Sequence, residues 1–357
     1  MRNCPRRFCA LCLSAAILLC FTGAALEKPR PLVIAHRGAN AYAPENTLPA
    51  FRKAAELGAD GAENDILLTK DGVVVISHDD TIDRCSDGTG RVDELTFAQL
   101  REYDFGSWFS PEFAGTQIPT LDEFLDVVAG MEFILIELKT NDRDIAAQAV
   151  AAVSARGLLG KTVFQSFDMD AIRACKAADP AAKIALLYGS GDYDRQIRTD
   201  PAAFIAAHRL DALHPQYNVV TSKLVRACEK AGVPVRAWTV NERNRISAVI
   251  GQGVRGIISD EIELCQTALQ SPAIVHWFMA VIGDIQNAFR QGTDIFPYRP
   301  DAAAWLQAGL NNGDPNVRNG YALLYYLLWP GAQAARLLYG LINNYCPLFS
   351  QAASLSA

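Results

Sequence analysis

The sequence predicts an α/β protein built on a (β/α)8 barrel, with a small insertion after a hairpin at the second strand and a helical C-terminal extension. Three observations support this fold. From Pro31 to about Gln270 of the 357 residues, β-type and α-type patterns alternate, which is typical of a parallel sheet covered by helices. The strand-like runs are apolar with little alternation, as in strands buried on both faces. Eight such runs fit into this stretch, which matches the barrel.

The strands and helices expected in the barrel follow one another along residues 31–270. Strands are expected at 31–36, 59–66, 133–139, 162–167, 183–189, 212–217, 233–240 and 256–260. Helices are expected at 46–58, 121–130, 144–157, 169–179, 201–209, 221–232 and 244–253. A doubly wound open sheet is the alternative, but no Gly-rich phosphate-binding motif follows the first strand.

The apolar run at 73–78 (VVVISH) is not counted among the eight strands. Only Thr69 to Gly72 separates it from the second strand, which is too short for a parallel crossover. We therefore expect a hairpin, with Asp71-Gly72 at its turn. The following stretch, about 80–119, is the predicted insertion, and irregular segments of this length usually carry function.

The two ends of the chain differ from the barrel. Three arginines in the first seven residues precede an uncharged apolar run that ends near small residues at 23–25. We interpret residues 1–26 as a signal peptide and expect an exported protein, which is secreted, periplasmic or at the cell surface. An uncleaved membrane anchor is the alternative, since the run is close to the length that spans a bilayer.

Residues 271–357 form the predicted C-terminal extension. Its most apolar run, 319–345, carries a single charge at Arg336 and is divided by Pro330-Gly331. One interpretation is a helical subdomain that packs on the barrel. The other is a peripheral membrane-contact or partner-docking element, which the clustered Tyr, Trp and Leu residues favour.

Charge and cysteine content exclude several classes of function. The net charge is −6 and no long Lys/Arg run occurs, which argues against nucleic acid as a partner. Four of the nine cysteines lie in the leader, and the other five are scattered with no Cys/His metal spacing. These five cysteines leave room for one disulfide, but a disulfide framework is not supported. The sequence leaves the oligomeric state undetermined.

Polar side chains recur where the expected strands end. Because the carboxyl ends of parallel strands meet at one rim of a barrel, and such enzymes place their chemistry there, we expect these side chains to line a common pocket. We assign Trp238, one of this set, to substrate binding. The set is His36, Arg37, Glu63, Asp65, Glu137, Lys139, Trp238, Asn241 and Asp260.

Three carboxylates of this set predict a metal site. Glu63 and Asp65 have the i, i+2 spacing that puts both on one face of a strand, and Glu137 ends the next barrel strand. Carboxylate oxygens suit one divalent cation, Ca²⁺ or Mg²⁺. The alternative is a structural ion pair of Glu63 or Glu137 with Lys139 or Arg37.

Two of the five histidines adjoin the expected metal site. His36 follows the first strand, and His78 ends the hairpin. Two imidazoles that titrate near neutral pH can act as paired general acid and base. Arg37 can form a forked contact with two phosphate oxygens. Together these groups favour the cleavage of a phosphodiester.

The same residues lie in motifs that resemble the glycerophosphodiester phosphodiesterase family. The resemblance extends in order from about Leu32 to Asp260 and leaves the region after Ser271 uncovered. The motifs are IAHRGANAYAPENTLPAF, GADGAENDILLTKDGVVVISHDDTIDRCSDGTG, YDFGSWFSPEFAGTQIPTLDEFL, ILIELK, FQSFD, RAWTVN and GIISD.

The resemblance implies a TIM barrel with a small insertion after the HD motif. It implies that Glu63, Asp65 and Glu137 bind the divalent metal, that His36 and His78 are the acid/base pair, and that Arg37 and Lys139 contact phosphate. The implied reaction hydrolyses glycerophosphodiesters, which are deacylated phospholipid head groups, to glycerol 3-phosphate and an alcohol. In some members the glycerol 2-hydroxyl is thought to attack first.

Two other functions remain open at this stage. A lysophospholipase D would use the same chemistry on a lyso-lipid, with residues 271–357 at a membrane surface. A non-catalytic module that binds glycerophosphates is the alternative of another class, although the complete metal and histidine set argues against it.

Overall fold

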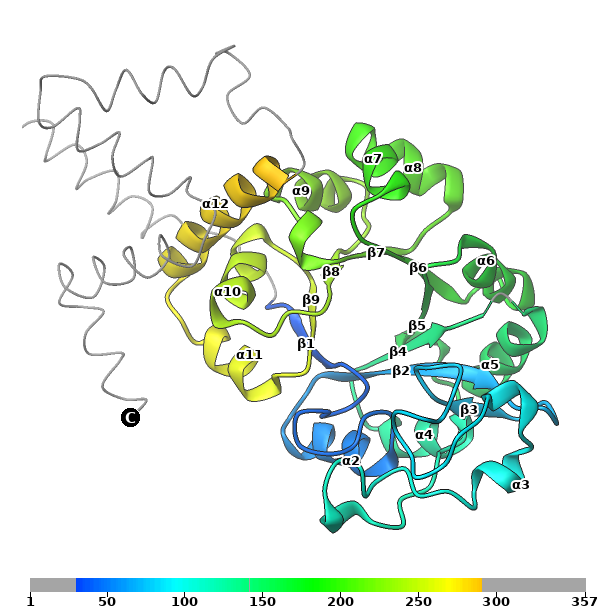
Figure 1. Ribbon diagram of the computed structural model, residues 1–357. Helices are drawn as coiled ribbons and strands as arrows, with labels where there is room; N and C mark the ends of the chain where they lie inside the picture. Colours follow the sequence, from blue (N-terminus) through cyan, green and yellow to red (C-terminus); the bar gives the residue numbers. More distant parts are fainter. Residues whose placement is uncertain (1–29, 141, 291–357) are drawn as a thin grey trace, which may run out of the picture. The chain divides into compact units, whose positions relative to one another are not determined.

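The computed structural model describes residues 30–140 and 142–290, and eight parallel strands form the centre of this part (Figure 1). The strands are β1 (Leu32–Ala35), β2 (Gly61–Leu68), β4 (Phe133–Leu138), β5 (Thr162–Ser166), β6 (Lys183–Tyr188), β7 (Ala212–Pro215), β8 (Arg236–Ala237) and β9 (Gly256–Ser259). All eight coincide with the strands expected from the sequence.

The strand order confirms the (β/α)8 barrel and not the open sheet. The hydrogen-bonded neighbours run β7-β6-β5-β4-β2-β1-β9-β8. Single parallel bridges, Leu213 with Val235 and Gln216 with Trp238, join β7 to β8. The expected strand at 233–240 is short in the structure because Pro234 has no N–H to donate to a ladder. Its carbonyl still accepts from Leu213 N at 3.1 Å.

Alternate residues of each strand face the inside and the outside of the barrel. In β4, Phe133 and Leu135 belong to a cluster that also contains Ile34, Val163 and Ile258. Ile134, Ile136 and Leu138 pack instead in the larger core with the surrounding helices. Glu137 therefore falls on the inner face, because it continues the series of Phe133 and Leu135.

Helices cover the outside of the barrel (Figure 1). They are α2 (Leu48–Glu56), α4 (Leu121–Val128), α5 (Arg143–Ala155), α6 (Met169–Ala178), α7 (Asp192–Thr199), α8 (Pro201–His208), α9 (Ser222–Lys230), α10 (Arg243–Gln252) and α11 (Ile262–Leu269). The seven expected helices are present, and α7 and α11 are additional. Polar N-caps start most of them, and Thr120 forms a full capping box with Glu123 at α4.

The expected hairpin is present. Strand β3 (Val74–Ile76) pairs antiparallel with the end of β2, and Gly72 at the turn has φ 78°, a left-handed conformation that favours glycine. The chain then makes a long excursion that contains α3 (Phe97–Leu100) and returns where Ile76 N donates to Pro119 O.

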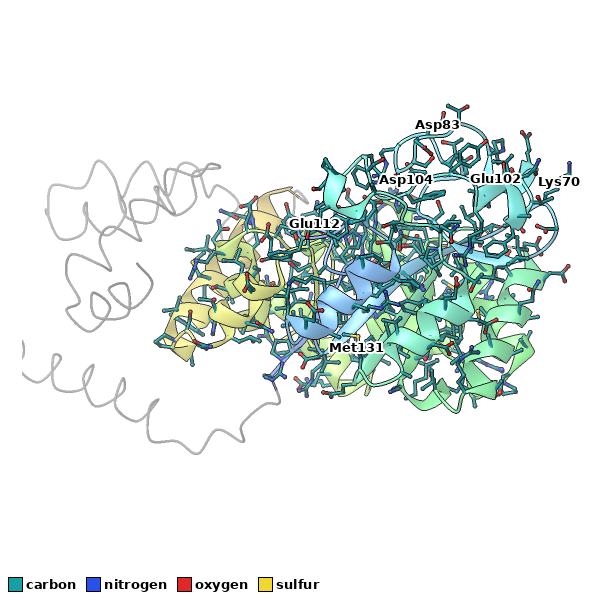
Figure 2. All side chains as sticks on the ribbon, turned by 90° about the horizontal axis from the view of Figure 1, so that it is seen from below. Lys70, Asp83, Glu102, Asp104, Glu112 and Met131 are labelled. Carbon is teal, nitrogen blue, oxygen red and sulfur yellow. The ribbon has the colours of Figure 1, made fainter. Side chains whose placement is uncertain are left out.

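The excursion has a small core of its own, to which Ile82, Val92, Leu100, Phe105 and Ile118 contribute. Figure 2 shows Asp83, Glu102, Asp104 and Glu112 of this segment at one end of the barrel, whereas Met131, just before β4, lies at the other. Since Met131 precedes a strand, the excursion lies at the end where the strands finish.

Helix α12 (Ala273–Arg290) is the described start of the C-terminal extension. It packs on α10 so closely that a Cβ on Gly251 would lie 1.9 Å from the carbonyl oxygen of His276. Its Asp284 accepts from Ser222 N and Gln252 Nε2 at 2.9 and 2.8 Å. Among the helices of residues 30–140 and 142–290, none combines the length and the hydrophobicity of a membrane span.

Several sequence-based predictions fall outside the described residues. These are the leader at 1–26 and the part of the extension from 291 to 357, so the domain limits 1–26, 31–270 and 271–357 stay predictions. Four cysteines, Cys85, Cys175, Cys228 and Cys265, are free, and Cys346 lies in the undescribed part.

Candidate active site

Strand register brings the three expected metal ligands together. Glu63 and Asp65 lie on the inner face of β2, and Asp65 is the Cα partner of Glu137 on β4. One carboxylate oxygen from each of the three lies within 4.8 Å of the other two, and all three side chains are buried. β2 continues to Leu68, so Glu63 and Asp65 lie within the strand and do not end it as the sequence suggested; Asp65 is one residue before the last pair of β2 with β4.

Cationic side chains partly neutralise this cluster. Lys139 Nζ lies 2.8 Å from Glu137 Oε1 and 3.4 Å from Asp65 Oδ1. Arg37 Nε lies 3.5 Å from Asp65 Oδ2. Of the ion pairs considered as an alternative to a metal site, that of Glu137 with Lys139 is present within it. The cluster still has three carboxylates facing two cations.

The electrostatics of the cluster are those of a site with excess negative charge. Burial and the charge of Asp65 raise the pKa of Glu63 and of Glu137 above the ordinary carboxyl value. Burial also acts to raise the pKa of Asp65, but the charges of Lys139 and Arg37 outweigh it and lower that pKa. A divalent cation would relieve this repulsion, so the donor set fits Ca²⁺ or Mg²⁺.

Backbone geometry at Arg37 helps to hold Glu63. Arg37 has φ 55°, which is uncommon for a residue other than glycine and often marks functional sites. In this conformation its N–H donates to Glu63 Oε2 at 2.9 Å. Gly38 follows with φ 79°, and a Cβ there would lie 2.8 Å from Ala50. The His36-Arg37-Gly38 turn is thus specified by close packing against α2.

Two further residues, which the sequence analysis did not assign, hold the carboxylates. Asn46 Nδ2 donates to Asp65 Oδ2 at 2.8 Å, and Gln165 Nε2 donates to Glu63 Oε1 at 3.3 Å. Asn46 belongs to the PEN stretch that precedes α2, and Gln165 to the FQSF run of β5. Their motifs were noticed, but sequence alone did not indicate which side chains turn inward.

His36 is held by the carboxylate of Asp260, the residue that directly follows β9. Its Nδ1 lies 2.7 Å from Asp260 Oδ1, and Asp260 also accepts from Asn40 and Asn241. Burial lowers the pKa of His36, but the bond to Asp260 and the charge of Glu63 outweigh it, so that the net shift is upward. Asp260, one of the strand-end residues, thereby orients the ring.

His78 is held by its neighbour in sequence. Its Nδ1 lies 2.6 Å from Asp79 Oδ1. Burial lowers the pKa of His78, an effect that the nearby charge of Asp65 only partly offsets. Both predicted histidines thus have a carboxylate at Nδ1, which leaves Nε2 as the nitrogen available for proton transfer.

Trp238 lies near the barrel mouth beside an aromatic residue that the sequence analysis did not assign. Its Nε1 donates to His214 O at 2.7 Å, and its ring meets Phe167 edge to face at 5.3 Å. Phe167 is 48 % exposed. An open cleft of about 550 Å³ adjoins Phe167 and is lined also by Asp168, Arg173, Tyr193 and His208.

Comparisons with known proteins agree with this fold and this set of side chains. The sequence profile of the glycerophosphoryl diester phosphodiesterase family matches residues 36–264. A glycerophosphodiester phosphodiesterase from Caldanaerobacter subterraneus subsp. tengcongensis is 37 % identical over 238 residues, which are 66 % of this chain and 96 % of the relative.

Two solved structures are similar as well. A phosphodiesterase from Oleispira antarctica, in complex with the product sn-glycerol-3-phosphate, has a TM-score of 0.59 at 30 % identity and covers 68 % of this chain and 98 % of its own. A glycerophosphodiester phosphodiesterase from Agrobacterium tumefaciens has a TM-score of 0.59 at 27 % identity, and the match covers 66 % of this chain and 98 % of the Agrobacterium chain. The chain therefore belongs to the glycerophosphoryl diester phosphodiesterase family and is an enzyme of that class, not a non-catalytic binding module.

Proposed function

We propose that this enzyme hydrolyses glycerophosphodiesters to sn-glycerol 3-phosphate and an alcohol, with one divalent cation held by Glu63, Asp65 and Glu137. The observation that carries the proposal is the convergence of these three carboxylates within 4.8 Å at the inner face of the barrel. The backbone of Arg37, which follows His36, bonds one of them. The sn-glycerol-3-phosphate in the Oleispira antarctica structure supports the substrate class.

A cation at this place would bind phosphate oxygens and supply a positive charge against the charge that develops on them. Arg37 and Lys139 are assigned to the same phosphate group. Both side chains already lie against Asp65, and Arg37 Nε is buried without a hydrogen-bond acceptor of its own. A phosphate oxygen would provide that acceptor.

The two imidazoles are assigned to proton transfer. In the hydrolysis, the oxygen of water or of the glycerol 2-hydroxyl forms a new bond to phosphorus while the bond from phosphorus to the head-group oxygen breaks. If the 2-hydroxyl attacks, water then opens the cyclic phosphate to give glycerol 3-phosphate. One histidine takes the proton of the attacking hydroxyl, and the other donates a proton to the leaving oxygen. Asp260 and Asp79 keep the two rings oriented, since each is bonded to an Nδ1 atom.

Aromatic side chains are assigned to the organic part of the substrate. Trp238 and the exposed Phe167 form a corner at the mouth of the barrel. Apolar contact with such a corner suits the carbon atoms of glycerol or of a head group.

A lysophospholipase D is the second candidate. Helix α12 exposes Trp277 and Val281 at 60 % and 39 %, and residues spaced i, i+4 share one face of a helix. Such an exposed apolar face is typical of elements that lie on a membrane surface. The same face would also suit an exported enzyme that attaches to the membrane surface. The support for export is the predicted leader at 1–26.

The test is a substrate panel assayed with defined metals. Enzyme freed of metal with EDTA is supplied with Ca²⁺ or Mg²⁺ and given glycerophosphocholine, glycerophosphoethanolamine or lysophosphatidylcholine. Release of the head-group alcohol, choline or ethanolamine, is measured for all three substrates, and glycerol 3-phosphate release is measured as well for the two glycerophosphodiesters. We expect turnover of the water-soluble diesters that depends on the added cation. A strong preference for the lyso-lipid would favour the second candidate, and turnover that persists in EDTA would contradict the metal role.

A further inference from the structure

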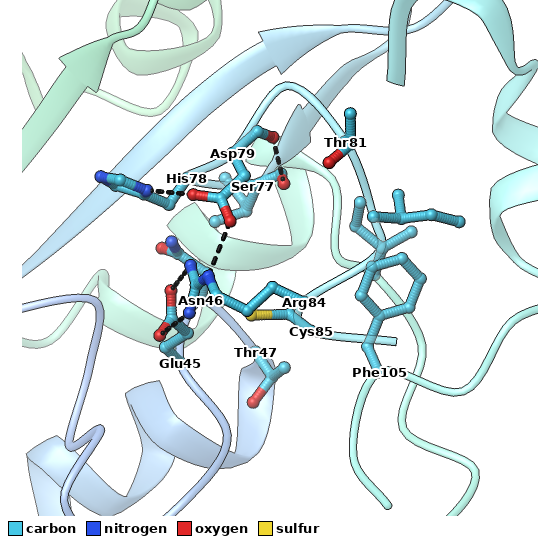
Figure 3. Close-up of a pocket in the computed structure, with 13 residues that line it drawn as sticks. Glu45, Asn46, Thr47, Ser77, His78, Asp79, Thr81, Arg84, Cys85 and Phe105 are labelled. Carbon is cyan, nitrogen blue, oxygen red and sulfur yellow. Dashed lines mark hydrogen bonds and ion pairs between the residues drawn. The ribbon is translucent and has the colours of Figure 1, made fainter. Parts of the chain in front are cut away.

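Arg84, in the excursion after β3, binds two carboxylates at once. Its Nε donates to Asp79 Oδ2 at 2.6 Å, and its Nη1 and Nη2 donate to the two oxygens of Glu45, each at 2.8 Å. Figure 3 shows the guanidinium between these side chains. The three residues come from different segments, since Glu45 precedes α2 and Asp79 follows β3.

Each of the two carboxylates also holds one residue of the proposed site. Asp79 uses its other oxygen, Oδ1, to bond His78 Nδ1 at 2.6 Å. Glu45 Oε1 accepts from Arg37 Nη1 at 2.8 Å. A continuous chain of charged hydrogen bonds therefore runs from His78 through Asp79, Arg84 and Glu45 to Arg37.

The geometry of Arg84 differs from that of an ordinary surface ion pair. Exposed pairs contribute little to stability because solvent screens them and the side chains remain mobile. Arg84 is 45 % exposed, but the side chain of Glu45 is only 12 % exposed, and the contact with it is forked. A forked guanidinium–carboxylate contact fixes both position and angle. Without the guanidinium of Arg84, the carboxylates of Glu45 and Asp79 would also repel each other.

We propose that Arg84 is a positioning residue for the reaction: it sets the orientation of His78 through Asp79 and that of Arg37 through Glu45. The inference rests on the proposed function of His78 and Arg37. It gives the excursion a role in the site, because Arg84 is the side chain by which this segment joins the two carboxylates.

The experiment compares Arg84→Ala and Arg84→Lys with the wild-type enzyme. With glycerophosphocholine and saturating cation, we expect Arg84→Ala to lower kcat by about 10- to 100-fold, the range typical for residues that orient site ligands, and to raise KM through Arg37. Arg84→Lys should recover only part of the loss, since an ammonium group cannot form the fork.

Arg91→Ala is the matched control. Arg91 lies in the same excursion and binds two carboxylates, Asp80 and Asp93, at 2.6 and 2.9 Å, but these are exposed and do not bond His78 or Arg37 in the part of the chain that the structure describes. A general loosening of the excursion would affect both variants. We expect kcat and KM of Arg91→Ala to match those of the wild type.

A double-mutant cycle separates positioning from structural damage. If Arg84 acts on kcat through His78, then adding Arg84→Ala to His78→Ala should lower kcat little further at saturating substrate. Equal losses in the two backgrounds would overturn the inference, as would a kcat of Arg84→Ala within about twofold of wild type while His78→Ala is inactive. If Arg84→Ala fails to fold, Arg84→Lys enters the same cycle. Wild-type turnover by His78→Ala would instead overturn the proposed function.

Discussion

At the scale of single residues, a buried arginine sets the direction of a hydrogen-bond chain that ends on Glu63. Arg236 Nη1 lies 3.4 Å from His214 Nε2, and since guanidinium only donates, Nε2 must accept. The proton of His214 is then on Nδ1, which lies 2.6 Å from Gln165 Oε1. This orients the amide nitrogen of Gln165 toward Glu63. Burial and the charge of Arg236 keep the pKa of His214 well below its ordinary value, in agreement with a neutral ring.

Gln165→Leu tests this chain. The change removes the donor to Glu63 Oε1, so the carboxylate should be less well oriented and the affinity for Ca²⁺ or Mg²⁺ should fall by about 10- to 100-fold. Calorimetric titration of the metal-free protein measures this without any turnover. Gln252→Leu is the control, because Gln252 is also buried but bonds Val220 O and Asp284 instead. Equal affinities in the wild type and Gln165→Leu would contradict the expectation.

The two site histidines give a second prediction at this scale. His36→Ala or His78→Ala should lower kcat by about 10²- to 10⁴-fold, the usual contribution of a general acid or base. Thermal unfolding should show that both variants remain folded. His208→Ala should keep its activity, because His208 contacts Arg173 and Phe204 at the end of α8 and none of the proposed site residues. Turnover near wild type in either site variant would show that the assignment is wrong.

At the scale of elements, the close approach of β2 and β4 positions the carboxylates. Gly61 opens β2 opposite Phe133, and a Cβ there would lie 2.5 Å from Phe133 O and 2.9 Å from Phe133 Cβ. Gly61→Ala should therefore push the strands apart and destabilise the fold by about 1–3 kcal/mol.

Denaturant unfolding measures the effect of Gly61→Ala, with Gly130→Ala as the control. Gly130 precedes β4, and a Cβ there has no neighbour within 4 Å. We expect Gly130→Ala to unfold at nearly the same denaturant concentration as the wild type. If Gly61→Ala unfolds there too, the strands can accommodate the extra methyl group and their spacing does not depend on glycine.

The elements also show how far the sequence could predict the fold. The eight barrel strands and the hairpin followed from apolar runs and linker lengths. Helix α7 was missed because its sequence, DYDRQIRT, is mostly polar. Helix α11 was omitted although Ile262, Cys265 and Ala268, its buried residues, have helical spacing.

The site was predictable to a similar extent. Polar residues in or after apolar runs drew attention to the three carboxylates, both histidines, Arg37 and Lys139, because such residues are unusual there, and the roles assigned to them stay predictions. The sequence could not give the register that pairs Asp65 with Glu137, since register depends on packing between strands far apart in the chain. Arg84, Gln165 and Asn46 were missed for the same reason: their partners are distant in sequence or lie across a turn.

At the scale of the whole molecule, the acidic cluster should make stability depend on pH and on cations together. Burial and the charge of Asp65 raise the pKa of Glu63 and Glu137, so without a cation these two groups bind more protons in the folded protein than in the unfolded chain above the ordinary carboxyl pKa. Stability then falls as pH rises. Burial lowers the pKa of His36, but Asp260 and Glu63 outweigh it and raise that pKa. His36 therefore also makes the folded state less stable as pH rises.

A divalent cation should reverse this loss, because it replaces the protons on the cluster and binds the folded state alone. Histidines with a lowered pKa, such as His78 and His214, act in the opposite direction below about pH 7, so the comparison is made from that pH upward. In EDTA, we expect the melting temperature to be lower at about pH 8.5 than at about pH 7, and added Ca²⁺ or Mg²⁺ to raise it more at the higher pH. Glu137→Gln should flatten the pH dependence in EDTA and reduce the cation effect, since it removes one of the two carboxyl groups of the cluster whose pKa is raised. A cation effect of equal size at both pH values, or one of undiminished size in Glu137→Gln, would mean that the ion binds elsewhere than at these three carboxylates.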